Sequence, residues 1–260
     1  MEEMIRVKNV SYDRYEELLM RRDAVKKEAF QYERAYIREF GDLILEVFQM
    51  KLECIRKKKT IEYCQAAVNH GKKVDQSQLQ EYLKKELAAF QKQLDKMITD
   101  TENAKTGGKI TEADLLLLKK IYHRLVKKMH PDINPKVAES EKLRELWQRV
   151  ITAYNCNDLI MMQETEVLIT KALAQMGNET MDIEIPDIED KISELEEEIT
   201  RIRETDPYQY IVLLSNPEAI SEKKNSLKEE KKSYEEYGDQ LEKILDDFLQ
   251  DGVSFTWRMN

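Results

Sequence analysis

No proline occurs in this 260-residue chain before Pro131, and this absence is the strongest constraint that the sequence places on the fold. Proline removes a backbone donor and ends helices, so a chain without it can stay helical over long stretches. The composition agrees, because 36% of the residues are charged and the chain has only 7 glycines and 5 prolines. Such usage is typical of long amphipathic helices rather than of sheets joined by turns. We therefore expect an all-α fold.

A regular apolar seam runs through the first part of the chain. Apolar residues recur there at alternating steps of four and three, which is the spacing of a coiled coil. Extended back to Tyr12, the helix would hold roughly 58 residues and span about 85 Å at 1.5 Å per residue. Gly41 lies inside the seam, where glycine costs about 1 kcal/mol relative to alanine, and it indicates close packing or a local kink. The seam consists of Tyr36, Phe40, Leu43, Val47, Met50, Cys54, Lys57, Ile61, Cys64 and Val68, of which only Lys57 is not apolar.

The same spacing returns after a polar break over His70–Gln78, which predicts a helical hairpin over residues 1–105. The second arm is shorter than the first. The overhanging part of the first helix must therefore pack against the C-terminal region or against a second copy of the chain, which would give a homodimer. The second arm carries Leu79, Leu83, Leu87, Phe90, Leu94 and Met97.

The C-terminal part repeats the pattern and predicts a second, acidic hairpin over residues 182–260. Its turn is expected over Asp206–Pro217, with a short helix over Tyr208–Leu214. From Asp182 to Glu204, ten acidic residues oppose three basic ones. The apolar positions are Ile188, Ile192, Leu195, Ile199 and Ile202, followed by Ile220, Leu227, Tyr234, Leu241 and Phe248.

A different module is predicted between the hairpins, over residues 109–176. Thr111–Asp114 reads as a capping box that opens a helix. That helix should end at His130-Pro131-Asp132, because proline disfavours helix at the residue before it. A second helix from about Val137 would pack against the first as an antiparallel pair. The pair would expose the His-Pro-Asp loop beside a row of cations, as a recognition surface for an acidic partner.

Residues 121–132, which read Ile-Tyr-His-Arg-Leu-Val-Lys-Lys-Met-His-Pro-Asp, resemble the J-domain of DnaJ-type co-chaperones. Trp147, Val150 and Ala153-Tyr154 look like the aromatic, aliphatic and Ala-Tyr positions of the third helix of that family. The Tyr-rich first helix of the family is absent, and residues 90–97 of the N-terminal hairpin could brace the module in its place. With no glycine-phenylalanine linker and no cysteine-repeat domain, the chain is similar to the class that shares only the J-domain.

The resemblance implies a function and a set of contact residues. In the family, the tripeptide and the basic helix bind a DnaK-class chaperone ATPase and stimulate its ATP hydrolysis. Carried over to this chain, His130, Pro131 and Asp132 form the triggering loop, and the docking face comprises Lys119, Tyr122, Arg124 and Lys127. The coiled-coil arms would bind a client or another partner protein.

Several other functions are not expected. No glycine-rich phosphate loop, Gly-x-Ser-x-Gly motif or paired nucleophile and base occurs in the sequence, so we expect neither enzyme activity nor a cofactor. His70 and His123 lack metal-ligand companions, and Cys54, Cys64 and Cys156 share no CxxC spacing, so we expect no metal site. The net charge of −9 argues against nucleic-acid binding.

No membrane association is expected, since no apolar run exceeds five residues, whereas a membrane span needs about twenty. The N-terminus lacks the basic start and apolar stretch of a secretory signal, which predicts a cytoplasmic location.

Two further hypotheses stay open at this point. The main alternative function is a coiled-coil scaffold whose J-like fold is degenerate and does not signal, with His130 an ordinary residue at a helix end. Separately, the opposite local charges suggest that the acidic segment Asp187–Glu204 covers the basic face of Lys120–Lys128 and holds the module inactive.

Overall fold

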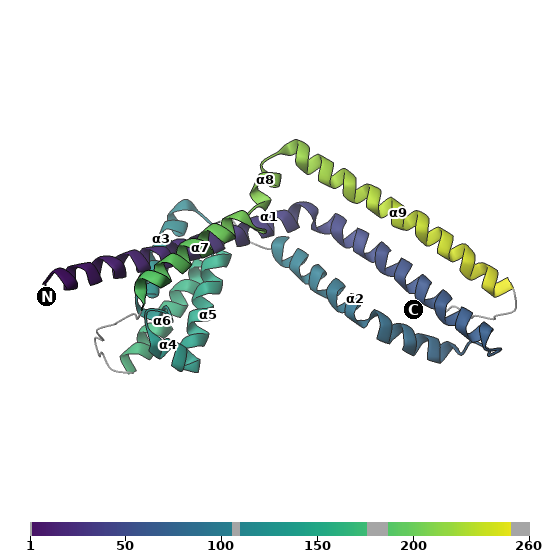
Figure 1. The fold of residues 1–260 in the computed structure, drawn as a ribbon, viewed down its shortest axis with the longest axis horizontal. Helices are drawn as coiled ribbons and strands as arrows, with labels where there is room; N and C mark the ends of the chain where they lie inside the picture. The colour runs from purple at the N-terminus through teal and green to yellow at the C-terminus, as the bar shows by residue number, and fades with distance from the viewer. Residues whose placement is uncertain (1, 106–109, 176–186, 251–260) are drawn as a thin grey trace. The chain divides into compact units, whose positions relative to one another are not determined.

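The computed structural model describes residues 2–105, 110–175 and 187–250, and every regular element within these ranges is a helix (Figure 1). The all-α prediction is confirmed. In chain order the helices are α1 (Glu2–Asn69), α2 (Gln76–Lys105), α3 (Glu112–Met129), α4 (Pro135–Glu139), α5 (Glu141–Cys156), α6 (Leu159–Gln175), α7 (Ile188–Glu204), α8 (Tyr210–Leu214) and α9 (Pro217–Gln250).

The helix ends follow local sequence chemistry. Between α1 and α2, Gly71 takes a φ of +62°, a left-handed conformation that glycine adopts without steric cost. Asp75 then caps α2, because its Oδ1 accepts hydrogen bonds from the amides of Ser77 and Gln78. The predicted cap of α3 is confirmed, with the Asp114 amide donating to Thr111 Oγ1 over 3.1 Å. The break after α7 and the short helix α8 also lie within the predicted turn.

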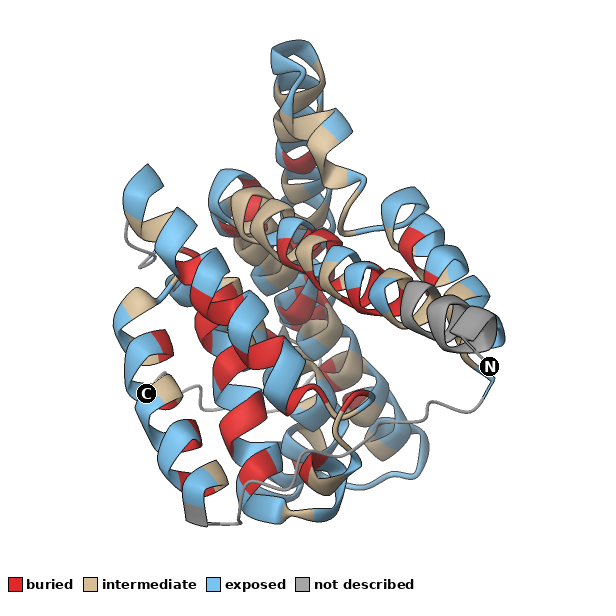
Figure 2. Ribbon diagram, turned by 90° about the vertical axis from the view of Figure 1, so that its left-hand side faces the viewer, coloured by how far each residue is buried: buried red, intermediate tan, exposed pale blue. Residues whose placement is uncertain are grey.

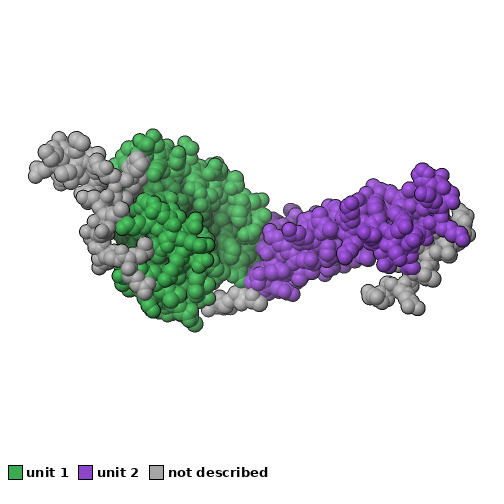
Figure 3. Space-filling model, turned by 90° about the horizontal axis from the view of Figure 1, so that it is seen from below, with its two compact units in different colours: residues 1–34, 107–212 green, residues 35–106, 213–260 purple. Residues whose placement is uncertain are grey.

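The chain forms two compact units, and neither corresponds to one of the three predicted segments (Figure 3). The first unit comprises residues 1–34 and 107–212, and the second comprises residues 35–106 and 213–260. Helix α7 belongs to the first unit and α9 to the second, which differs from the C-terminal hairpin that the heptads suggested. The predicted boundaries at 109, 176 and 182 lie outside the described residues.

The first unit has the larger core. Helices α3, α5 and α6 pack against one another, and the resulting surface is covered by residues 11–34 of α1, which we call the proximal segment, and by α7. Tyr15, Leu18 and Leu19 of the proximal segment are at most 3% exposed. Figure 2 shows buried positions along the helix that begins at the N-terminus. The proximal segment therefore braces the module. Residues 90–97, the brace suggested by the sequence, belong to the second unit.

The second unit places residues 35–69 of α1 between α2 and α9 (Figure 1). On one side Phe40 and Val47 pack with Leu227 of α9. On the other side the rings of Tyr63 and Tyr82 of α2 lie 5.3 Å apart. Cross-helix ion pairs flank both contacts, with Lys231 bound to Glu46 at 3.0 Å and Lys59 bound to Glu86 at 3.2 Å. The long first helix thus packs against the C-terminal region. This was one of two alternatives that the sequence left open, the other being a second copy of the chain.

Two helical glycines of this unit offer a matched test of the packing. An added Cβ at Gly41 would lie 3.1 Å from Thr101 Oγ1 and 3.2 Å from Ile37 Cγ2, a close approach that explains glycine in the seam. An added Cβ at Gly238 would meet Cys54 Sγ at 3.5 Å, an ordinary contact.

We expect Gly238→Ala to raise the free energy of unfolding by about 0.5–1 kcal/mol, because alanine lowers the backbone entropy of the unfolded chain. Gly41→Ala should raise the free energy of unfolding by less, or should lower it, because the added Cβ would be crowded by Thr101 and Ile37. Urea denaturation followed by circular dichroism measures both. Equal gains at the two positions would contradict the close approach of α1 and α2.

Candidate functional site: the His-Pro-Asp loop

The His-Pro-Asp loop (residues 130–132) connects α3 to α4 and is fixed from both sides. The His130 amide still donates to Val126 O at 3.0 Å, while its own carbonyl accepts from the amides of Ile133 and Asn134 at 2.9 and 2.8 Å. Asn134 adds a second anchor, because its Nδ2 donates to Lys128 O at 2.9 Å and its Oδ1 caps α4. The loop is therefore held as a defined turn by the helices that flank it.

Aromatic rings from α3 and α5 form the floor beneath the loop. The rings of Tyr122 and Tyr154 stack with centroids 3.8 Å apart at an interplanar angle of 8°. The Trp147 ring lies 6.2 Å from the Tyr122 ring at an interplanar angle of 24°, and it meets the His130 ring edge-on at 5.3 Å. The residues that carried the resemblance thus contact one another, and they anchor His130 from below.

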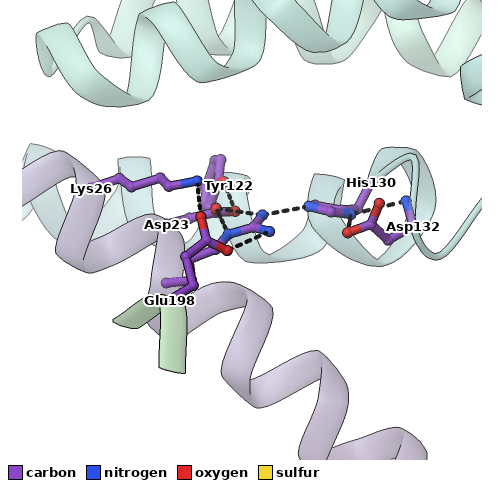
Figure 4. Close-up of polar contacts among 7 residues, drawn as sticks. Asp23, Lys26, Tyr122, His130, Asp132 and Glu198 are labelled. Atoms are coloured by element: carbon purple, nitrogen blue, oxygen red, sulfur yellow. Dashed lines mark hydrogen bonds and ion pairs between the residues drawn. The ribbon is translucent and has the colours of Figure 1, made fainter. Parts of the chain in front are cut away.

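His130 is only 4% exposed, because the proximal segment lies over it. Its Nδ1 lies 3.2 Å from the Asp132 amide, and its Nε2 lies 3.0 Å from Nη2 of Arg22 (Figure 4). The Arg22 guanidinium is itself held by Asp23 at 2.9 Å and by Glu198 of α7 at 3.8 Å. Arg22 therefore links α1 to His130 on one side and to α7 on the other.

Burial lowers the pKa of His130 below its ordinary value, and the carboxylates of Asp132 and Asp23 offset this only in part. A neutral ring suits the contact with Arg22, since a protonated Nε2 would present a hydrogen to a group that can only donate. The site as built thus favours the uncharged imidazole.

Asp132 is the most accessible polar member of the loop, with 45% of its side chain exposed. It lies at the edge of a cavity of about 490 Å³ between the proximal segment and α7. The hydroxyl of Tyr15 adjoins Asp132, and burial together with this carboxylate raises the pKa of Tyr15 to about 12. The remaining lining residues are Arg22, Lys191, Glu194, Leu195, Glu197, Glu198 and Arg201.

The expected docking face on α3 is mostly engaged within the chain. Tyr122 is fully buried, and its hydroxyl donates to Asp23 Oδ2 over 2.6 Å, so it differs from the exposed contact residue that the resemblance implied. Arg124 pairs with Glu166 of α6 at 2.7 Å, and Lys127 pairs with Glu16 of the proximal segment, also at 2.7 Å. Lys119 is exposed. Three of the four residues thus have partners within the chain, although the side chains of Arg124 and Lys127 remain 53 and 60% exposed.

The most influential neighbours of the loop were not singled out from the sequence. Asp23 and Lys27 of the proximal segment are each 7% exposed, and Lys27 Nζ lies 3.9 Å from the centroid of the Tyr154 ring. Burial, together with the charge of Lys119, lowers the pKa of Lys27 to about 8. The continuing apolar stripe of Tyr15, Leu18 and Val25 was the available signal that this stretch packs against a core.

The contacts of α7 differ from the hypothesis that this acidic helix covers the basic face of α3. The carboxylates of α7 bind cations of the proximal segment, through Glu196 to Arg14 at 2.8 Å and Glu198 to Lys26 at 2.7 Å. Within the described ranges, the ion pairs of α3 run instead to Glu16 and Glu166. The proximal segment covers the loop, and α7 binds the proximal segment.

No protein-family model, curated protein or solved structure matches this chain. Among the described residues, no cluster of His, Cys, Asp or Glu side chains could hold a metal ion. No helix in the same ranges is both long and apolar enough to cross a membrane.

We expect Tyr122→Phe to lower the free energy of unfolding by about 1–3 kcal/mol, because it leaves the buried Asp23 carboxylate without one of its donors. Urea denaturation measures the change. Tyr237→Phe, at an exposed tyrosine of α9, is the control and should change stability by less than about 0.5 kcal/mol. A similar small effect at Tyr122 would exclude a structural role for its hydroxyl.

The stability of the protein should also depend on pH through His130. Because its pKa is lowered in the folded state, the unfolded chain binds the proton first, and stability is lost as the pH falls below about 6.5. The stability difference between the wild type and His130→Gln should therefore shrink from pH 7.5 toward pH 5. Urea denaturation at several pH values measures this difference in stability. A difference that does not change with pH would contradict a lowered pKa of His130 in the folded protein.

Proposed function

We propose that this chain is a non-enzymatic co-chaperone that binds a DnaK-class chaperone ATPase through its His-Pro-Asp loop and stimulates ATP hydrolysis by that partner. The observation that carries the proposal is the loop itself. It is a rigid turn between two packed helices, held by backbone hydrogen bonds and by an aromatic floor, with the Asp132 carboxylate at the edge of a cavity. A fixed, partly exposed carboxylate is suited to binding a cation of a partner protein.

The chemistry in this proposal belongs to the partner, so the contribution of this chain is binding alone. Asp132 would pair with a partner cation, and Lys119, Lys127 and Arg124 would meet acidic groups once their contacts within the chain are exchanged. The long helices of the second unit would bind a client or another protein, or a second copy of this chain. Exchange of exposed ion pairs costs little, because each contributes only about 0.2–1 kcal/mol.

A scaffold with a non-signalling J-like fold is the second candidate. One observation favours it: His130 and Tyr122 are both buried by the proximal segment, and in this arrangement they serve the core of the first unit. In that case the long helices alone would carry the function.

Single-turnover ATP hydrolysis by a DnaK-class partner distinguishes the two candidates. We expect the full chain to accelerate hydrolysis, and His130→Gln and Asp132→Asn to abolish the acceleration. His123→Gln, at an exposed histidine of α3, is the matched control and should retain it. Circular dichroism checks that each variant keeps its helices. Acceleration that survives both loop variants, or no acceleration by the wild type or by any folded variant in which His130 is uncovered, would favour the scaffold.

A further inference from the structure

We propose that the proximal segment and α7 form an intramolecular clasp that closes the His-Pro-Asp loop, and that a partner reaches His130 only when Arg22 leaves it. This inference rests on the proposed function and adds the regulation of the same site. The clasp consists of Arg22, which contacts His130, and of Glu198, which contacts Arg22 (Figure 4).

Arg22 contacts the Nε2 edge of the His130 ring, while Trp147 of α5 packs against the same ring. The Arg22 side chain is 15% exposed and reaches from α1 to the imidazole across a sequence separation of 108 residues. Asp23 binds the same guanidinium through its Oδ1 and accepts the Tyr122 hydroxyl through its Oδ2. The orientation of Arg22 is thus fixed by a carboxylate that is buried against α3.

Helix α7 holds the clasp through a row of polar contacts along the proximal segment. Ser11 donates to Glu189, Arg14 binds Glu196, and Lys26 binds Glu198. Glu189 and Glu196 are seven residues apart and share one face of α7, whereas Glu198, two residues further on, reaches the proximal segment from another side of the helix. Leu195 and Ile199 of the same helix add apolar contacts to the core.

The ion pairs that hold α7 against the proximal segment are mostly exposed, although Arg22 and Glu198 themselves are only 15 and 27% exposed. Arg14, Lys26 and Glu196 are 41, 48 and 51% exposed, and ion pairs at such positions are weak and screened by salt. Lys127, in turn, is released from Glu16 if the proximal segment shifts. Opening would therefore uncover His130 and free one basic residue of α3 in a single movement.

Chemical modification of histidine tests the clasp without any partner. The chain has three histidines, of which His70 and His123 are exposed and His130 is buried, so the two exposed rings serve as internal references. We expect diethyl pyrocarbonate to modify His130 far more slowly than His123 in the full wild-type chain, as followed by peptide mass spectrometry. Rapid modification of His130 in the wild type would overturn the clasp.

Substitution of Arg22 should open the site. Arg22→Gln is expected to speed the modification of His130 by roughly five- to tenfold and to leave His123 unchanged, because it removes the group that covers the ring. The neighbouring Arg21 is exposed, and Arg21→Gln should have no effect. If Arg22→Gln fails to fold, Glu198→Gln loosens the same contact from α7 and should give a smaller gain, of about two- to threefold. His130 that stays protected in the folded variants contradicts the clasp.

The ATPase assay then separates the regulation from the function. We expect Arg22→Gln to stimulate a DnaK-class partner several-fold more than the wild type at equal concentration, and Arg22→Gln with His130→Gln not to stimulate. Stimulation equal to that of the wild type, with His130 uncovered, would overturn the clasp as a regulator and leave the proposed function standing. If no variant stimulates although His130 is uncovered, the proposed function and its regulation both fail.

Discussion

The first unit depends on the buried carboxylate of Asp23. A buried charge is tolerated only when hydrogen bonds and opposite charge compensate it, and Asp23 obtains both from the Tyr122 hydroxyl and the Arg22 guanidinium. These contacts join the proximal segment to α3 and hold Arg22 against His130. Loss of either partner would leave an uncompensated charge in the core, so the packing of the unit and the closure of the loop share one cause.

Because the contacts of Asp23 both pack the unit and close the loop, the same site is compatible with a co-chaperone and with a scaffold. The aromatic floor and the hydrogen-bonded turn provide what a docking loop requires, namely a fixed presentation of Asp132. The same floor buries His130 once the proximal segment is in place. A scaffold and a closed co-chaperone would therefore look alike in this conformation. They differ in whether the weak, exposed contacts of α7 open when a partner competes for them.

The helices and their ends were predictable because their causes are local. The Thr111 cap of α3, the break at Gly71 and the prolines after α7 each act within a few residues. The pairing of helices was not predictable in the same way. Heptad seams are degenerate, so the apolar stripe of α7 could pack on α9 or on α1 with similar chemistry. The structure places Leu195 and Ile199 in the core of the first unit, with the proximal segment.

The order of the residues is enough to predict an all-α chain, a long first helix and a His-Pro-Asp turn at the end of a capped helix. What covers that turn depends on contacts between distant parts of the chain. Arg21 and Arg22 are adjacent and chemically identical, yet a helix rotates by about 100° per residue, and this rotation directs Arg22 to His130 and leaves Arg21 exposed. Whether Arg21 or Arg22 contacts His130 depends on the rotation of α1 about its own axis. That rotation is set by the packing of Tyr15, Leu18 and Leu19 against a core from distant parts of the chain.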